Sequence, residues 1–179
     1  MGRWLDDPRH RALTTLLDDL VPGDGVSPGA GAAGGADYID GLLSAFDVDP
    51  PRIWAGGPFS GRHGGDASFG EFLELGPWEA LAWRTRIQEY QEIYTAGLLA
   101  LGDDYATVDP ATRAGRLAAT EAGFRDLAFE HACESLYGDP VYGGNGDGAA
   151  WRAIDFRGDS QPAGYTDAEV TFPHGPGGP

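Results

Sequence analysis

The residues whose types and spacing could support acid–base or metal chemistry lie close together in the segment EHACE, residues 130–134. Glu130 and Glu134 are one helical turn apart and His131 follows Glu130, so one helix could offer two carboxylates and an imidazole. A metal-binding bundle needs further ligands on facing helices, but the chain has four His in all and no Glu-x-x-His pair. His131 also follows Phe124 by seven residues on the apolar face, which favours a hydrogen-bonded histidine in the core or at an interface. A stand-alone metal-dependent helical enzyme using Glu130, His131 and Glu134 is the alternative function.

The stretch YGDPVYGGNGDGAAWRAIDFRG, residues 137–158, could be a phosphate loop, a calcium loop or a surface for another protein. A phosphate-binding glycine loop joins a strand to a helix, whereas this stretch follows a predicted helix and its acids would repel phosphate. Its acids also do not fall at the alternate positions of an EF-hand. A weak cation-binding site formed by Asp139, Asn145 or Asp147, without a known motif, is the less favoured alternative. The favoured interpretation is an Ω-type loop in which Gly and Asn adopt positive φ and Tyr142 and Trp151 pack the interior.

Nucleophilic catalysis has little support from the sequence. Cys133 stands among acidic neighbours, which do not lower the pKa of a thiol. No Ser-His-Asp or Cys-His arrangement can be assembled with any specificity. We therefore expect a chain without a catalytic site of its own.

The elements that must position these residues are predicted to be helices. Apolar residues recur at helical spacing, and Asp-Pro or Gly-Pro pairs precede three of the helical segments. The first predicted helix begins at Asp7-Pro8, with Asp7 as the cap, and ends at Val21, and the second runs from Tyr38 to near Asp49. The third runs from Gly76-Pro77 to about Leu101. The fourth runs from Asp109-Pro110 through Leu117, and the last follows a break or kink at Gly123 and ends near Leu136. No segment alternates long enough to predict a sheet. The fold class is therefore all-α, a small helical bundle with long Gly/Pro-rich loops.

The remaining segments are predicted to be loops around a single domain, residues 1–172. Residues 23–36 have the composition of a flexible, low-complexity loop. Residues 50–76 are predicted to be irregular structure. Its aromatic anchors are Trp54, Phe59, Phe69 and Phe72. The tail, residues 173–179, is predicted to be disordered.

Composition excludes some functions and favours a partner. Twenty-eight acids face twelve bases, and the net charge of -16 argues against nucleic acid and against an anionic membrane surface. No apolar run reaches the roughly twenty residues that a membrane span needs, so we expect no direct membrane insertion. Leu, Ile, Val and Phe make up 35 of 179 residues and Gly and Pro make up 42. A chain with so little apolar residue content either depends on a partner surface or is a small stable domain with long loops.

Three stretches carry a resemblance to a known family. They are LLDDLVPGDGVSPGAGAAGGADYIDGLL, YTAGLLAL, and DPVYGGN with Trp151 six residues beyond it. Together they resemble the gluconate 2-dehydrogenase subunit 3 family over roughly residues 11–165. The DPVYGGN motif with its Trp is the specific part, whereas the segment after Trp151 matches loosely.

The resemblance implies a non-catalytic small subunit that stabilises, and assists the folding of, a large flavoprotein dehydrogenase of the glucose-methanol-choline type. FAD is then expected on the partner subunit, which oxidises a sugar, alcohol or glycoside, and no cofactor is expected in this chain. An electron-accepting cytochrome subunit is a further candidate partner. The residues expected at or directly behind the subunit contact are His131, Asp139, Pro140, Tyr142, Gly143, Gly144, Asn145 and Trp151. Members often begin with a twin-arginine leader, which the start MGRWLDDPRH lacks. A cytoplasmic complex is therefore expected, with export to the periplasm or cell envelope together with the partner as the alternative.

Overall fold

The computed structural model describes residues 3–56 and 73–156. Most of these residues are helical, which confirms the predicted all-α class. The α-helices are α1 (Asp7–Leu20), α2 (Gly35–Leu43), α3 (Pro77–Leu101), α4 (Pro110–Ala119), α5 (Ala122–Tyr137) and α6 (Ala149–Ala153). Strands β1 (Trp54–Gly56) and β2 (Leu73–Glu74) form a short antiparallel ladder that the sequence did not predict, because strands of two or three residues show no alternation.

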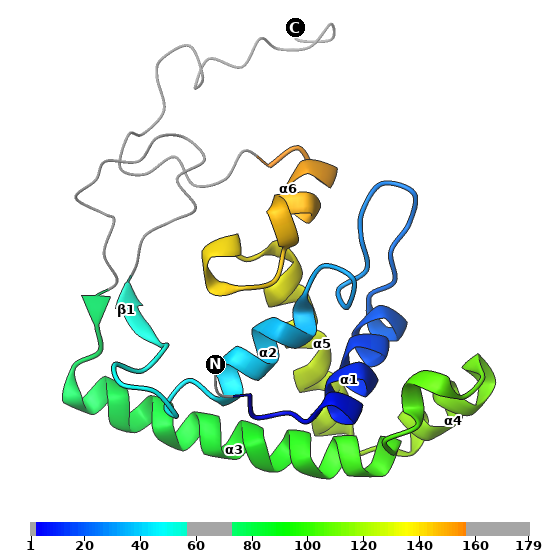
Figure 1. Cartoon of the computed structure of the whole chain (residues 1–179), viewed down its shortest axis with the longest axis horizontal. Coiled ribbons are helices and arrows are strands. Elements are labelled where there is room, and N and C mark those ends of the chain that lie inside the picture. The colour runs from blue at the N-terminus through cyan, green and yellow to red at the C-terminus, as the bar shows by residue number, and fades with distance from the viewer. Residues whose placement is uncertain (1–2, 57–72, 157–179) are drawn as a thin grey trace, which may run out of the picture.

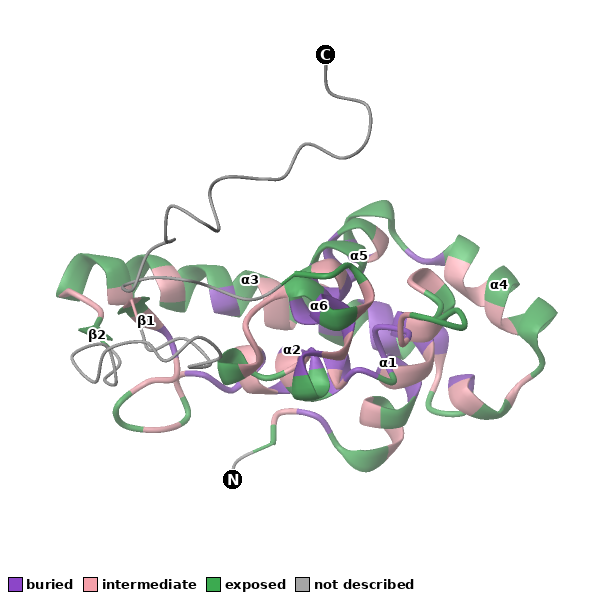
Figure 2. Ribbon diagram, turned by 90° about the horizontal axis from the view of Figure 1, so that it is seen from above, coloured by how far each residue is buried: buried purple, intermediate pink, exposed green. Residues whose placement is uncertain are grey.

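The core forms where α1, α2 and α5 meet above α3. Figure 1 shows α3 lying across one side of the molecule, with the other three helices packed against it and against one another. Buried residues concentrate at this junction, as the view from above shows (Figure 2). Helix α3 supplies Ile87, Tyr94, Leu98 and Leu101, which recur at helical spacing, to the interior, and each is at most 3% exposed. The helical periodicity of the sequence therefore identified the buried face of the longest helix.

Helix α4 is attached mainly by polar contacts, since none of its residues is buried. Its Arg113 donates to both carboxylate oxygens of Asp19 on α1, at 2.7 and 3.0 Å. Tyr105, in the 3-10 turn before α4, donates to the same carboxylate at 3.0 Å. The planar guanidinium suits this two-point contact, so Asp19 ties α4 back to the main bundle.

Two of the predicted helix starts hold, and a third is displaced by one residue. Helix α3 begins at Pro77, and α4 begins at Pro110 with the Asp109 carboxylate accepting from two backbone N–H groups. Helix α1 is capped by Asp6 rather than the predicted Asp7, because the Asp6 carboxylate accepts from the Arg9 N–H at 2.9 Å. Proline then occupies the second rather than the first helical position.

Three predictions about loops and helix ends are wrong. The segment 23–36 is not a flexible loop, because Ala30 is fully buried and the backbone packs closely on α1. Helix α2 ends at Leu43 rather than near Asp49, and the chain turns there so that Ala45 enters a second apolar cluster. Gly123 neither breaks nor kinks a helix, since it lies in the first turn of α5, after the break between α4 and α5.

Some predictions fall outside the described residues. The anchors Phe59, Phe69 and Phe72 and the tail 173–179 lie outside the ranges that the structure describes. Within those ranges, no helix is both long enough and apolar enough to cross a membrane.

Candidate partner interface

Asn145 is the centre of the segment that follows α5. It is fully buried, and its backbone adopts the left-handed conformation with φ of 41°. The side-chain amide donates to the Gly138 carbonyl at 3.0 Å, and the amide oxygen accepts from the Ala150 N–H at 3.0 Å. One side chain therefore connects the end of α5 to the start of α6. Asn suits this position because it tolerates positive φ better than most residues with a side chain.

The two glycines before Asn145 bring the backbone close to the bundle. Both Gly143 and Gly144 have positive φ, as the sequence predicted for this segment. A Cβ at Gly144 would lie 2.4 Å from the Ser135 carbonyl oxygen of α5, so this position accepts only glycine without displacement. Further along, the Gly146 N–H donates to the Ala33 carbonyl at 3.0 Å, ahead of α2. The segment is thus packed onto two parts of the bundle rather than extending into solvent.

Trp151 packs the interior of this segment as predicted, whereas Tyr142 lies on its surface. Trp151 is 3% exposed, and its Nε1 donates to the Tyr137 carbonyl at 2.6 Å. Its ring meets Phe156 edge to face, with centroids 5.0 Å apart. Tyr142 is 46% exposed and its ring centroid lies 6.3 Å from that of Trp54. The prediction that Tyr142 packs the loop from within is therefore wrong, because the turn at 140–142 directs it outward.

Five apolar side chains of the 137–156 segment are exposed to solvent. Between 36% and 56% of each remains exposed. They are Tyr137, Val141, Tyr142, Ile154 and Phe156. Their exposure makes these side chains candidates for contact with another protein. We call these five residues the apolar surface of the 137–156 segment.

His131 is a core histidine. It is 2% exposed, its Nδ1 and the Tyr94 hydroxyl are hydrogen-bonded at 3.1 Å, and the two rings lie parallel. The Tyr90 ring meets the imidazole edge to face, with centroids 4.9 Å apart. Burial lowers the pKa of His131 to about 4, so the imidazole is neutral near pH 7. This agrees with the predicted hydrogen-bonded histidine.

The two glutamates beside His131 point elsewhere. Glu130 and Glu134 are exposed, and Glu134 accepts from the Tyr38 hydroxyl at 3.2 Å. Glu134 is exposed as a residue, but partial desolvation of its carboxylate raises its pKa, with the charge of Glu130 adding to the shift. Over residues 3–56 and 73–156, no group of three or more His, Cys, Asp or Glu side chains is placed to hold a metal ion. The structure therefore does not bring the residues of the alternative metal site together.

The residues predicted at the contact differ in burial and fall into three groups. Tyr142 and Gly143 are exposed, whereas Asp139, Pro140 and Gly144 are half-buried; His131, Asn145 and Trp151 are buried. The three buried residues could hold an interface in place from the interior, but they do not reach the surface where a partner would bind. The predicted contact residues did not include the exposed Tyr137, Val141, Ile154 and Phe156, whose one signal was apolar character in a segment rich in Gly and Asp.

Comparisons of the chain with models of protein families, with characterised proteins and with solved structures found no match. The likeness to gluconate 2-dehydrogenase subunit 3 rests on the three sequence stretches alone. The structure shows how the most specific stretch, the DPVYGGN motif with Trp151, folds and which of its side chains reach solvent.

Proposed function

We propose that this chain is a non-catalytic accessory subunit that stabilises, and assists the folding of, the large subunit of an FAD-dependent sugar, alcohol or glycoside dehydrogenase. The observation that carries the proposal is the apolar surface of the 137–156 segment. This segment contains the DPVYGGN motif and Trp151, the most specific part of the family resemblance. The same residues that give the resemblance also hold an exposed apolar surface in place.

Internal hydrogen bonds hold the backbone of the 137–156 segment in place. Asn145 and Trp151 fix the backbone from inside through three hydrogen bonds, so Tyr142 and Phe156 are already ordered before a partner arrives. Pre-ordering reduces the entropy lost on association. Exposed aromatic residues are common hot spots, each costing about 2 kcal/mol or more when truncated.

In the proposed complex, FAD and the catalytic residues belong to the large subunit, and this chain contributes the contact surface. A cytochrome subunit that accepts electrons is a further proposed partner. The proposed setting is the cytoplasm, with export alongside the large subunit as the alternative.

The test is co-expression with a flavoprotein encoded by a neighbouring gene. We expect the two chains to elute together on size exclusion and the large subunit to become soluble and active as a flavin-dependent dehydrogenase. Chains that elute separately, with a large subunit that is equally soluble alone, would contradict the proposal. A pair that forms during expression and separates on purification would identify a folding chaperone rather than a permanent subunit.

Substitution of the exposed aromatic residues locates the contact. Tyr142→Ala with Phe156→Ala should lower recovery of soluble large subunit about tenfold or more, since two hot-spot side chains are lost. Trp78→Ala is the control, because Trp78 is an aromatic residue that is 82% exposed in the first turn of α3, outside the 137–156 segment. Equal recovery with both variants would place the contact elsewhere on the chain.

A further inference from the structure

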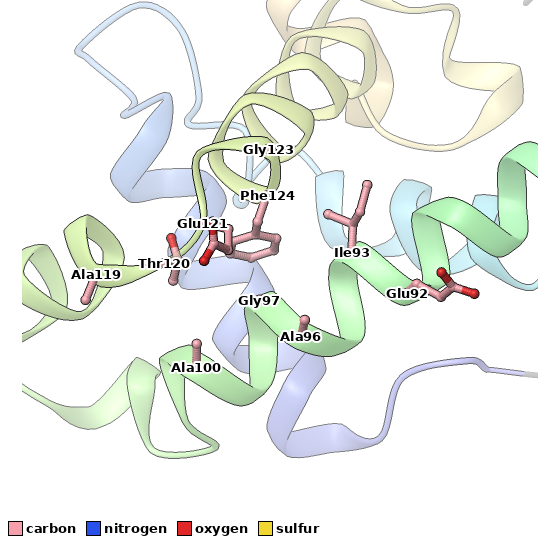
Figure 3. Close-up of a pocket in the computed structure, with 10 residues that line it drawn as sticks. All are labelled: Glu92, Ile93, Ala96, Gly97, Ala100, Ala119, Thr120, Glu121, Gly123 and Phe124. Carbon is pink, nitrogen blue, oxygen red and sulfur yellow. The ribbon is translucent and has the colours of Figure 1, made fainter.

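A second apolar feature lies on α3, away from the 137–156 segment. A groove of about 390 Å³ opens between the C-terminal half of α3 and the junction of α4 with α5. Figure 3 shows the ring of Phe124 beside Gly97, with Ala96 and Ala100 on neighbouring turns of α3. In Figure 1, α3 and α6 lie on opposite sides of the bundle, so the groove and the apolar surface of the 137–156 segment are separate features.

Small residues create the groove. A Cβ at Gly97 would lie 2.2 Å from the Phe124 ring, so glycine here lets the ring pack directly on the backbone of α3. Ala96 and Ala100 are exposed beside this contact. A Cβ at Gly123, at the start of α5, would meet nothing within 4 Å. The walls are thus apolar and the space between them is open to side chains from outside.

The charge of the groove is negative. Glu92 and Glu121 are the charged residues of its lining. Arg125, the nearest base along α5, is not part of the lining and donates to the backbone carbonyls of Leu117 and Thr120 at the end of α4. An occupant therefore meets an apolar floor and carboxylates at the edge, without a cation from this chain in the lining.

The groove continues along α3 as a shallower depression. This second depression shares Glu92 and Ala96 with the first and extends back to Gln88. From Gln88 to Ala100 the helix rises about 18 Å, or more than three turns. Leu99, which is 73% exposed, lines the shallower part. This length matches a helical peptide segment better than a single small molecule.

We propose that this face of α3 binds a cationic amphipathic helix of a partner protein, whose apolar side chains enter the groove while its Lys or Arg residues face Glu92 and Glu121. Charge decides between this occupant and a second copy of the chain. A second copy would bring a further net charge of -16 to an acidic face, which like-charge repulsion disfavours. The inference goes beyond the proposed function, because it concerns a different surface and does not depend on what binds the 137–156 segment.

Binding of a designed peptide tests the proposal. The probe is a fluorescein-labelled peptide of about 18 residues, built from Leu, Ala and Lys with the leucines at helical spacing. We expect saturable binding by fluorescence anisotropy, weakened at least about tenfold by Ala100→Leu, since loss of one apolar anchor commonly has this effect. Ala82→Leu is the matched control, because Ala82 is exposed on α3 outside the groove, and it should change affinity less than about twofold. Leu is a good helix former, so both variants should fold.

Further comparisons separate specific docking from attraction to an acidic protein. A peptide of the same composition in scrambled order should bind weakly and without sensitivity to Ala100→Leu. Glu92→Gln with Glu121→Gln should weaken the helical peptide more than Asp47→Asn with Glu74→Gln, which removes the same charge from exposed positions away from the groove. Equal binding of both peptides, equal effects of the two charge pairs, or a self-association in sedimentation that Ala100→Leu abolishes would each overturn the proposal.

Discussion

At the scale of single residues, Asn145 has the most demanding role among the described residues of the candidate interface. Its side chain forms hydrogen bonds with the backbone of both Gly138 and Ala150, and so links the end of α5 to α6. Its φ of 41° is one that side-chain-bearing residues adopt at a cost, whereas glycine does not incur that cost. These two properties can be separated by substitution.

We expect Asn145→Ala to lower the free energy of unfolding by about 3 kcal/mol, of which about 2 comes from two buried hydrogen bonds and about 1 from the left-handed backbone. Asn145→Gly keeps the backbone freedom and should lose only about 2 kcal/mol. Urea denaturation of both variants measures the difference. Equal losses would mean that the backbone conformation contributes nothing.

At the scale of elements, the segment 23–36 shows how small residues fix a connection. Its glycines look flexible in the sequence, yet a Cβ at Gly31 would lie 2.0 Å from the Thr14 carbonyl oxygen of α1. The Ala32 N–H donates to the Asp18 carboxylate on the same helix at 3.1 Å. The glycines therefore serve close packing on α1, and their effect depends on position rather than on number.

Gly31→Ala should destabilise the protein by about 1–3 kcal/mol, because the new methyl group must displace the backbone of α1 or of the segment. Gly25→Ala in the same segment is the matched control. A Cβ there meets nothing within 4 Å and the φ is not positive, so this change should be neutral or stabilising by a few tenths of a kcal/mol. Thermal unfolding followed by circular dichroism measures both, and similar melting temperatures would refute the close packing.

At the scale of the whole molecule, the contact between α3 and α5 contains a buried pair of polar side chains, His131 and Tyr94. His131 on α5 is hydrogen-bonded to Tyr94 on α3, and burial lowers the pKa of His131 from 6.5 to about 4. Below pH 6.5 the unfolded chain takes up a proton that the folded chain does not bind. Stability therefore falls as pH drops from 6.5 towards 4, by about 1.4 kcal/mol per unit.

Over that interval we expect His131 to account for about 3 kcal/mol of lost stability, through the proton bound only by the unfolded chain. Urea unfolding between pH 7 and pH 4 measures the loss, and His131→Gln should reduce its dependence on pH although the variant is less stable at pH 7. The same pH profile for His131→Gln as for the unaltered chain would contradict this role.

The helical class, most helix limits and the buried face of α3 could be predicted from the sequence. These follow from periodicity and from Asp-Pro and Gly-Pro starts, which act within a few residues along the chain. It also predicted positive φ around Asn145 and the buried Trp151, because Gly, Asn and Trp have strong local preferences.

Which side chains reach solvent depends on tertiary packing, and the sequence did not predict it. The packing of residues 23–36 on α1, the outward position of Tyr142 and the groove beside Gly97 all depend on contacts between segments far apart in the chain. The same holds for His131, whose partner Tyr94 is 37 residues away. Composition and spacing carry no information about such distant neighbours, because a glycine or an aromatic residue gains its role from what packs against it.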